Sequence, residues 1–91
     1  MPKLTDAQLD DALATLPGWE VQDGQISKTY EFGSYQAGVD FAVELAGEAD
    51  TRDHHPDITI TYKKVKVSLS THSEGGITEK DTGLASFAEG L

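Results

Sequence analysis

The sequence predicts an α+β fold: a four-stranded antiparallel sheet with helices packed on one face, in the element order αββαββα. Apolar residues recur at helical spacing in three segments, and two pairs of segments with period-two alternation lie between them. Hairpins that alternate with helices are typical of an antiparallel sheet covered by helices. The chain has 91 residues, enough for one hydrophobic core, so we expect a single domain over residues 1–91.

The first helix begins at Thr5, which has the spacing of a capping box with Gln8. Apolar residues then recur every three or four positions, at Leu9, Ala12, Leu13 and Leu16. Pro17-Gly18 ends this helix.

The first hairpin follows directly. Trp19 and Val21 alternate with polar residues as in a strand, and Asp23-Gly24 predicts a tight turn, because glycine allows the positive φ that such a turn requires. The returning strand, residues 25–32, places three aromatic or aliphatic side chains on one face: Ile26, Tyr30 and Phe32. Lys28 falls on that same face and is an exception to the pattern.

The second helix is capped by Ser34 and spans residues 35–49 or slightly more. Its buried stripe consists of Gly38, Phe41, Ala42, Leu45 and Ala49. Three carboxylates, those of Glu48, Asp50 and Asp53, crowd its C-terminal end, where the helix dipole prefers cations. The dipole and these carboxylates would stabilise a protonated histidine just beyond, which is the first physical indication of proton transfer at this point of the chain.

The second hairpin begins after Pro56, which disfavours helical backbone for the residue before it, so the chain extends there. We expect a strand over residues 57–62 and a turn at Lys63-Lys64. The partner strand carries its apolar residues on one face: Val65, Val67 and Leu69. By the same alternation, His72 points away from the core or lies at the end of this strand.

A third helix follows Gly75-Gly76, which ends the strand region. Thr78 and Asp81 have capping-box spacing, with Asp in place of the usual Glu or Gln. The apolar stripe of this helix consists of Leu84, Phe87, Ala88 and Leu91.

The composition excludes several classes of function. The chain has no cysteine, so it has no disulfide framework, thiolate nucleophile or cysteine-type zinc site. The formal net charge of −9 argues against a nucleic-acid partner. The first residues lack the apolar region of a signal peptide, and no apolar run approaches the ~20 residues of a membrane span. We therefore expect a cytoplasmic protein with no membrane partner.

All three histidines lie between residues 50 and 81: the adjacent pair His54-His55, and His72 after the second hairpin. Imidazole is the side chain whose pKa ordinarily lies nearest neutrality, so it donates or accepts a proton at low cost. Three histidines also suit a metal site. Because neighbouring side chains diverge in an extended segment, we favour acid–base chemistry over a metal.

The spacing of these residues resembles the signature of the pterin-4a-carbinolamine dehydratases. The matching positions are Asp50, His54, His55, Pro56, Tyr62, His72 and Asp81, and the surrounding runs Tyr62-x-Lys64-Val65, Leu69-Ser70-Thr71-His72 and Asp81-x-x-Leu84-Ala85 are similar too. The resemblance implies a four-stranded sheet with three helices. It also implies a carbon–oxygen lyase that dehydrates 4a-hydroxytetrahydropterin, such as 4a-hydroxytetrahydrobiopterin, to quinonoid dihydropterin in pterin recycling, without cofactor or metal.

Carried over by position, the resemblance implies three catalytic histidines: His54, His55 and His72. It implies substrate-binding or supporting roles for Asp50, Asp53, Pro56, Asp57, Ser70, Thr71 and Asp81, although Asp81 is equally well explained as a first-turn carboxylate. The chain departs from the family at Asp57, where Glu is frequent, at Ile58, where Trp is frequent, and in the loop Glu74-Gly75-Gly76. These departures leave the proton-transfer groups intact and bear on pterin affinity and selectivity.

We hypothesise that His54 and His72 act as acid and base while His55 orients or binds the pterin. Asp50 and Asp53 would fix the histidine tautomers or raise the basicity of the histidines. The alternative is a non-catalytic pterin-binding or protein-interaction module, since some members of the resembled family serve as dimerisation cofactors of a transcription factor. The resemblance further implies a homodimer or homotetramer. No particular protein partner is encoded in the sequence.

Overall fold

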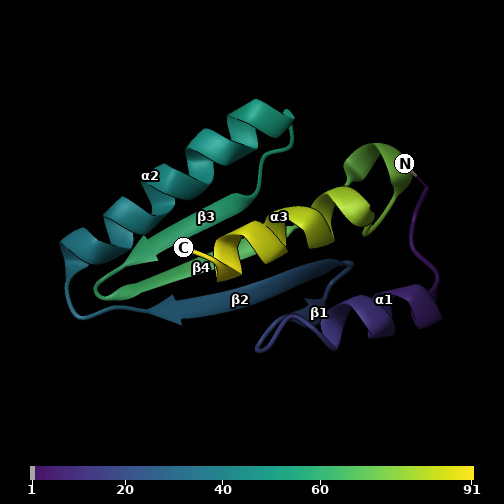
Figure 1. Cartoon of the computed structure of the whole chain (residues 1–91), viewed down its shortest axis with the longest axis horizontal. Helices are drawn as coiled ribbons and strands as arrows, with labels where there is room; N and C mark the ends of the chain where they lie inside the picture. Colours follow the sequence, from purple (N-terminus) through teal and green to yellow (C-terminus); the bar gives the residue numbers. More distant parts are fainter. Residues whose placement is uncertain (1) are drawn as a thin grey trace.

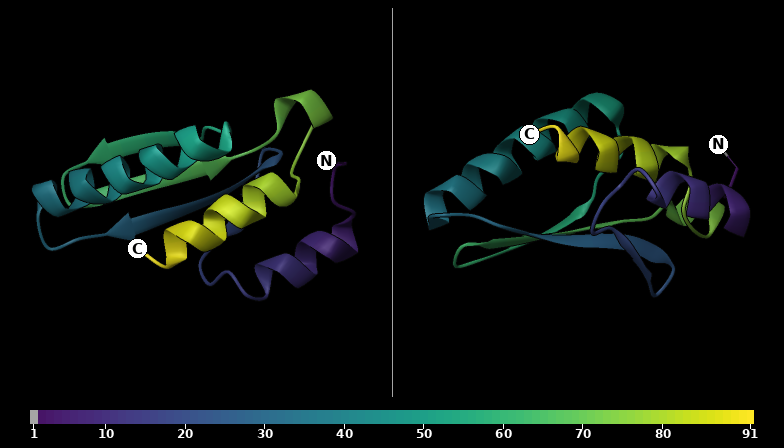
Figure 2. Two further views of the ribbon diagram at one scale, coloured as in Figure 1. Left: turned by 45° about the horizontal axis from the view of Figure 1, so that its top comes forward. Right: turned by 60° about the horizontal axis from the view of Figure 1, so that its bottom comes forward.

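The computed structural model describes residues 2–91 and confirms the predicted order of three helices and four strands (Figure 1). The elements are α1 (Asp6–Leu13), β1 (Glu20–Gln22), β2 (Gln25–Glu31), α2 (Tyr35–Arg52), β3 (Asp57–Thr61), β4 (Lys64–Leu69), a 3₁₀ turn η1 (His72–Glu74) and α3 (Glu79–Glu89). The strands form one antiparallel sheet in the order β1-β2-β4-β3. Helices α2 and α3 lie on one face of this sheet (Figure 2).

The predicted helix starts are confirmed. Thr5 accepts the backbone N–H of Gln8 at 3.1 Å, and the Gln8 side chain accepts the N–H of Thr5 at 2.9 Å, which completes a capping box. Ser34 accepts the N–H of Ala37 at 3.1 Å at the start of α2. Local sequence therefore fixes where these helices begin, and the predicted stripe of α2 is buried against the sheet.

The first hairpin turns at Asp23 and Gly24, which have φ of 54° and 78°, the positive values that the sequence predicts for a two-residue turn. Lys28 lies on the core side of β2 because its ammonium group reaches the end of α3. Its Nζ donates to Glu89 at 2.8 Å and to the carbonyl of Pro17 at 2.6 Å. The exception in the alternation of β2 is thus an ion pair between sheet and helix.

The second hairpin corrects the predicted turn. Thr61 pairs with Lys64, so the turn consists of Tyr62 and Lys63, not of Lys63 and Lys64, and Lys63 has a φ of 62°. The error is one residue, because two consecutive lysines give no local signal for the positive φ. The inward face of β4 is buried as predicted: Val65, Val67 and Leu69.

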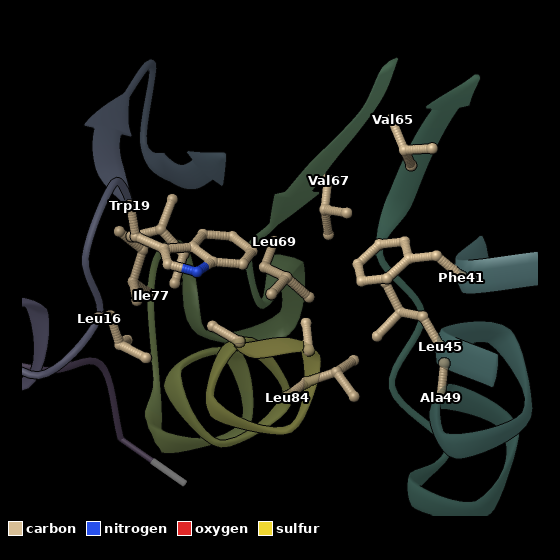
Figure 3. Packing of buried hydrophobic residues seen from close by; sticks show 13 residues of the cluster. Leu16, Trp19, Phe41, Leu45, Ala49, Val65, Val67, Leu69, Ile77 and Leu84 are labelled. Carbon is tan, nitrogen blue, oxygen red and sulfur yellow. The ribbon is translucent and has the colours of Figure 1, made fainter. Parts of the chain in front are cut away.

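One hydrophobic cluster joins the elements. Leu45 of α2 and Leu84 of α3 lie on the same side of the sheet as Val67 and Leu69 of β4 (Figure 3). Trp19 and its neighbours close the cluster at the β1 end. This core sets the C-terminal end of α2 beside the N-terminal part of α3, where His54 meets Asp81. Among residues 2–91, no helix combines the length and apolarity needed to cross a bilayer.

Candidate active site

His54 is positioned by the way α2 ends. Asp53 adopts the left-handed conformation, with φ 50° and ψ 44°, and the N–H of His54 donates to the carbonyl of Ala49 at 3.0 Å. The N–H of Asp53 also donates to the carbonyl of Asp50 at 3.2 Å. These two bonds form a Schellman motif, which satisfies the last carbonyls of the helix and fixes the direction in which the chain leaves it.

The imidazole of His54 is held by Asp81, which lies in the first turn of α3. His54 Nε2 is 2.5 Å from Asp81 Oδ1; the side chain of His54 is 11% exposed and that of Asp81 is fully buried. The other oxygen, Oδ2, accepts the N–H of Thr78 at 2.9 Å and the hydroxyl of Thr71 at 2.8 Å. Asp81 is therefore a capping-box residue of α3 and also the hydrogen-bond partner of His54.

Two buried hydroxyls complete this network. The Oγ1 atoms of Thr71 and Thr78 lie 2.9 Å apart, and Thr78 Oγ1 accepts the N–H of Lys80 at 3.2 Å. Within residues 2–91, every buried side-chain nitrogen or oxygen has a hydrogen-bond partner. The network is thus fully satisfied, a condition under which buried polar groups hold a single arrangement.

His55 has a different environment from its neighbour. Its Nε2 lies 2.9 Å from Asp50 Oδ1, and the two side chains are 58% and 80% exposed. An exposed pair of this kind contributes little to stability, because water competes for both groups. The structure brings Asp50 to His55, whereas Asp53 acts on His54 through the backbone.

His72 is the first residue of η1, shortly after β4 ends at Leu69. This agrees with one of the two predicted placements, at the end of the strand. The loop of His72 is closed by a bridge between Thr71 and Gly76, with N–H···O distances of 2.8 and 3.3 Å. His72 is exposed on this loop. His72 is connected to the rest of the site through the preceding residue, Thr71, whose hydroxyl donates to Asp81.

Two surface hollows flank the network. One, of about 340 Å³, is lined by Arg52, His54, Glu79 and Lys80. The other, of about 250 Å³, is lined by Asp23, Gly24, Ser70, His72, Gly75 and Gly76. The two hollows share no lining residue, and His54 and His72 are connected through Asp81, which binds His54 and accepts the hydroxyl of Thr71, the residue before His72.

Of the other predicted residues, Ser70 lines one of these two hollows, that of His72, whereas Pro56 and Asp57 line neither. Pro56 connects the histidine pair to β3, and Asp57 begins β3, where its register partner is Ser68. Three residues beside His54 were missed: Arg52, Glu79 and Lys80. Their sequence signal is only their position, at the end of one helix and the start of another, and nothing local indicates that these ends meet.

The arrangement suits proton transfer. A carboxylate that binds one ring nitrogen of an imidazole orients the ring and leaves the other nitrogen for a reacting group. His54 has this relationship to Asp81, beside a hollow large enough to hold a small ring. Within residues 2–91, no three side chains of His, Cys, Asp or Glu are grouped so that they could hold a metal ion.

The chain is similar to one family of known proteins over nearly its whole length. Residues 2–91 match the family described as “Pterin 4 alpha carbinolamine dehydratase”. A “Putative pterin-4-alpha-carbinolamine dehydratase” of Herpetosiphon aurantiacus is 52% identical over 85 residues, which cover 93% of this chain and 88% of the relative. A protein of the same name from Mycolicibacterium vanbaalenii is 44% identical over 91 residues, 100% of this chain and 98% of the relative.

Solved structures are similar as well. The crystal structure of a protein described as a transcriptional coactivator/pterin dehydratase from Brucella melitensis superimposes with a TM-score of 0.93 at 33% identity, over 97% of this chain and 96% of that one. A pterin dehydratase-like protein described as a RuBisCO assembly factor in the alpha-carboxysome gives a TM-score of 0.65 at 20% identity, over 79% and 83% of the two chains. The second likeness shows the shared fold alone.

Proposed function

The chain belongs to the pterin-4a-carbinolamine dehydratase family, and we propose that it is a hydro-lyase that converts 4a-hydroxytetrahydropterin to quinonoid dihydropterin and water. The observation that carries the mechanism is the contact of His54 Nε2 with the buried carboxylate of Asp81 at 2.5 Å. The family supports a pterin as the substrate; the tetrahydrobiopterin side chain is the finer part of the proposal.

The reaction needs two proton transfers and no redox partner. A proton is delivered to the hydroxyl on C4a, the C–O bond breaks, and water leaves. The lone pair of N5 forms the C=N bond, and N5 then loses its proton, so that atoms and charge balance. Each positioned acid or base contributes about 10²–10⁴-fold to the rate of such a reaction.

In this proposal His54 is one proton-transfer group and His72 is the other. Because Asp81 occupies Nε2 of His54, the nitrogen of His54 that meets the pterin is Nδ1. His72 acts from its loop at the far side of Thr71. His55, exposed and paired with Asp50, binds or orients the substrate at the rim.

The test is to generate 4a-hydroxytetrahydropterin and follow its loss by absorbance with and without the purified protein. The proposal predicts a first-order rate that rises in proportion to protein concentration, with water and quinonoid dihydropterin as products. A rate equal to that of buffer alone would refute the catalytic proposal, and it would favour the alternative of a pterin-binding or protein-interaction module.

The proposed homo-oligomer has a candidate surface on α2. Tyr35 and Val43 are exposed there, two turns apart on the helix, with Val39 between them. Replacing Val43 with Asp should lower the mass measured by sedimentation towards that of one chain. A wild-type protein that sediments as a monomer at all concentrations would refute the proposed homo-oligomer.

A cytoplasmic location is a further prediction, which fractionation of the source cells would test.

A further inference from the structure

We infer that Thr71 is a positioning residue for the proposed dehydration: its hydroxyl fixes the carboxylate of Asp81 and thereby the tautomer of His54. The inference rests on the proposed function for its kinetic consequences, although its structural part does not. Thr71 lines neither hollow. It acts through Asp81, whose Oδ1 binds His54 and whose Oδ2 accepts hydrogen bonds at the start of α3.

The direction of each hydrogen bond in the network follows from the chemistry of the groups. An ionised carboxylate only accepts, so the single hydroxyl proton of Thr71 is donated to Asp81 Oδ2. The Thr71 oxygen is then the acceptor in its contact with Thr78, and the Thr78 hydroxyl is the donor. The Thr78 oxygen in turn accepts the N–H of Lys80. No hydroxyl proton in this chain of bonds is left over.

The consequence falls on His54. Oδ2 of Asp81 accepts two donors, the hydroxyl of Thr71 and the N–H of Thr78, and Oδ1 faces the imidazole. The nitrogen that meets Oδ1 must carry hydrogen, so neutral His54 has its proton on Nε2 and an unprotonated Nδ1. Nδ1 is the atom that the proposed reaction needs, because it alone is free to exchange a proton with the substrate.

Thr71 also joins the two histidine segments. Its side chain binds Asp81, the partner of His54, while its backbone bonds to Gly76 and closes the loop on which His72 lies. It is 6% exposed, so its position is set by packing on all sides. One residue therefore sets the orientation of His54 and the root of the His72 loop.

The chain offers a matched pair of variants. Thr71→Val keeps the branched shape and removes the hydroxyl, which leaves Oδ2 of Asp81 with one donor and the Thr78 hydroxyl without its acceptor. Thr71→Ser keeps the hydroxyl and removes only a methyl group. If Thr71 serves packing alone, Ser is the more damaging change; if it positions Asp81, Val is.

The experiment measures kcat and KM between pH 5 and 9 for the wild type and both variants, and records the ¹⁵N chemical shifts of the His54 ring. We expect Nε2–H in the wild type, and in Thr71→Val a mixture of tautomers, a kcat about 10- to 100-fold lower, within the contribution of one acid or base, and a nearly unchanged KM. Thr71→Ser should keep the tautomer and most of kcat.

Three results would overturn the inference: Nδ1–H as the dominant tautomer of the wild type, an unchanged tautomer and kcat in Thr71→Val, or a greater loss in Thr71→Ser than in Thr71→Val. The wild-type spectrum gives the first result even if Thr71→Val does not fold. The ring shifts need no turnover, so a wild type that shows the expected tautomer and its dependence on Thr71 but dehydrates nothing would refute the proposed function and leave the positioning role intact.

Discussion

Asp81 Oδ1 lies 2.5 Å from His54 Nε2, while Oδ2 of the same carboxylate accepts the N–H of Thr78 at the start of α3. One buried side chain thus caps a helix and holds an imidazole that comes 27 residues earlier in the sequence. Stability and the geometry of the site are coupled through this carboxylate, so changes to it should affect both.

The first prediction concerns Asp81→Asn. The amide of Asn has nearly the same shape as the carboxylate, but one of its two polar atoms is a donor and not an acceptor. One of the three groups that donate hydrogen bonds to Asp81 therefore loses its acceptor. We expect the free energy of unfolding to fall by about 1–3 kcal/mol, the cost of an unsatisfied buried group, with a loss of turnover. Urea unfolding measures the first effect. Asp57→Asn, at an exposed position, is the control and should change stability by less than ~0.5 kcal/mol. Equal stability of the two variants would contradict the role given to Asp81.

The second prediction separates the adjacent histidines. Replacing His54 with Ala leaves Asp81 Oδ1 buried without its donor, at a cost of about 1–3 kcal/mol. His55→Ala removes only an exposed pair and should change the free energy of unfolding by less than ~0.5 kcal/mol. Thermal or urea unfolding of the two variants side by side checks this ordering. A His55 variant that is the less stable of the two would reverse our assignment of their environments.

A third prediction tests the left-handed residue that ends α2. Asp53 has a φ of 50°, a conformation that glycine adopts freely and that costs other residues roughly 1 kcal/mol. Asp53→Gly should therefore be about 1 kcal/mol more stable than Asp53→Ala. Because we assign Asp53 a backbone role, Asp53→Gly should also keep its dehydratase rate. A large loss of rate in a stable Asp53→Gly protein would show that the carboxylate itself takes part.

The fourth prediction concerns the other end of α3, where Glu89 Oε2 accepts from Lys28 at 2.8 Å, from Trp19 at 3.3 Å and from the hydroxyl of Tyr30. Burial by itself would raise the pKa of Glu89, but the hydrogen bonds from Lys28 and Tyr30 outweigh it and lower the pKa below the ordinary 4.5. The stabilisation is thus complete above about pH 4.5 and is lost as the pH falls through the folded-state pKa.

Glu89→Gln should accordingly destabilise the protein at pH 7, and the difference from the wild type should shrink as the pH falls below 4.5. On the alkaline side, burial and the bond to Glu89 raise the pKa of Tyr30 above its ordinary 10.0, so stability should decline as the pH rises past that value. Urea titrations across this range measure both arms. A Glu89→Gln difference that grows towards acid pH would contradict the assigned sign.

Local signals account for the parts of the fold that the sequence predicts well. Capping boxes, the Asp23-Gly24 turn and the alternation along β4 depend on residues within a few positions of one another, and each is present as expected. The turn at Tyr62-Lys63 is displaced by one residue because register there is decided by the pairing of Thr61 with Lys64, which no turn residue marks.

The contacts of the candidate site depend on tertiary packing as well as on local sequence. Capping-box spacing identifies Asp81 as the residue that closes the start of α3, and one of its oxygens does so. The other oxygen meets His54 only because the core places the end of α2 beside α3, and no periodicity encodes that contact. The hydroxyl bonds between Thr71 and Thr78 depend in the same way on tertiary packing.

The most direct test of the proposed mechanism is the rate constant for loss of saturating 4a-hydroxytetrahydropterin with the His72→Ala protein, whose fold is first checked by circular dichroism. If His54 and His72 are the two proton-transfer groups for one bound substrate, this rate constant should fall by about 10²-fold or more, as expected when one acid or base is removed. A rate constant equal to that of the wild type would contradict the account, because His72 would then have no part in the reaction.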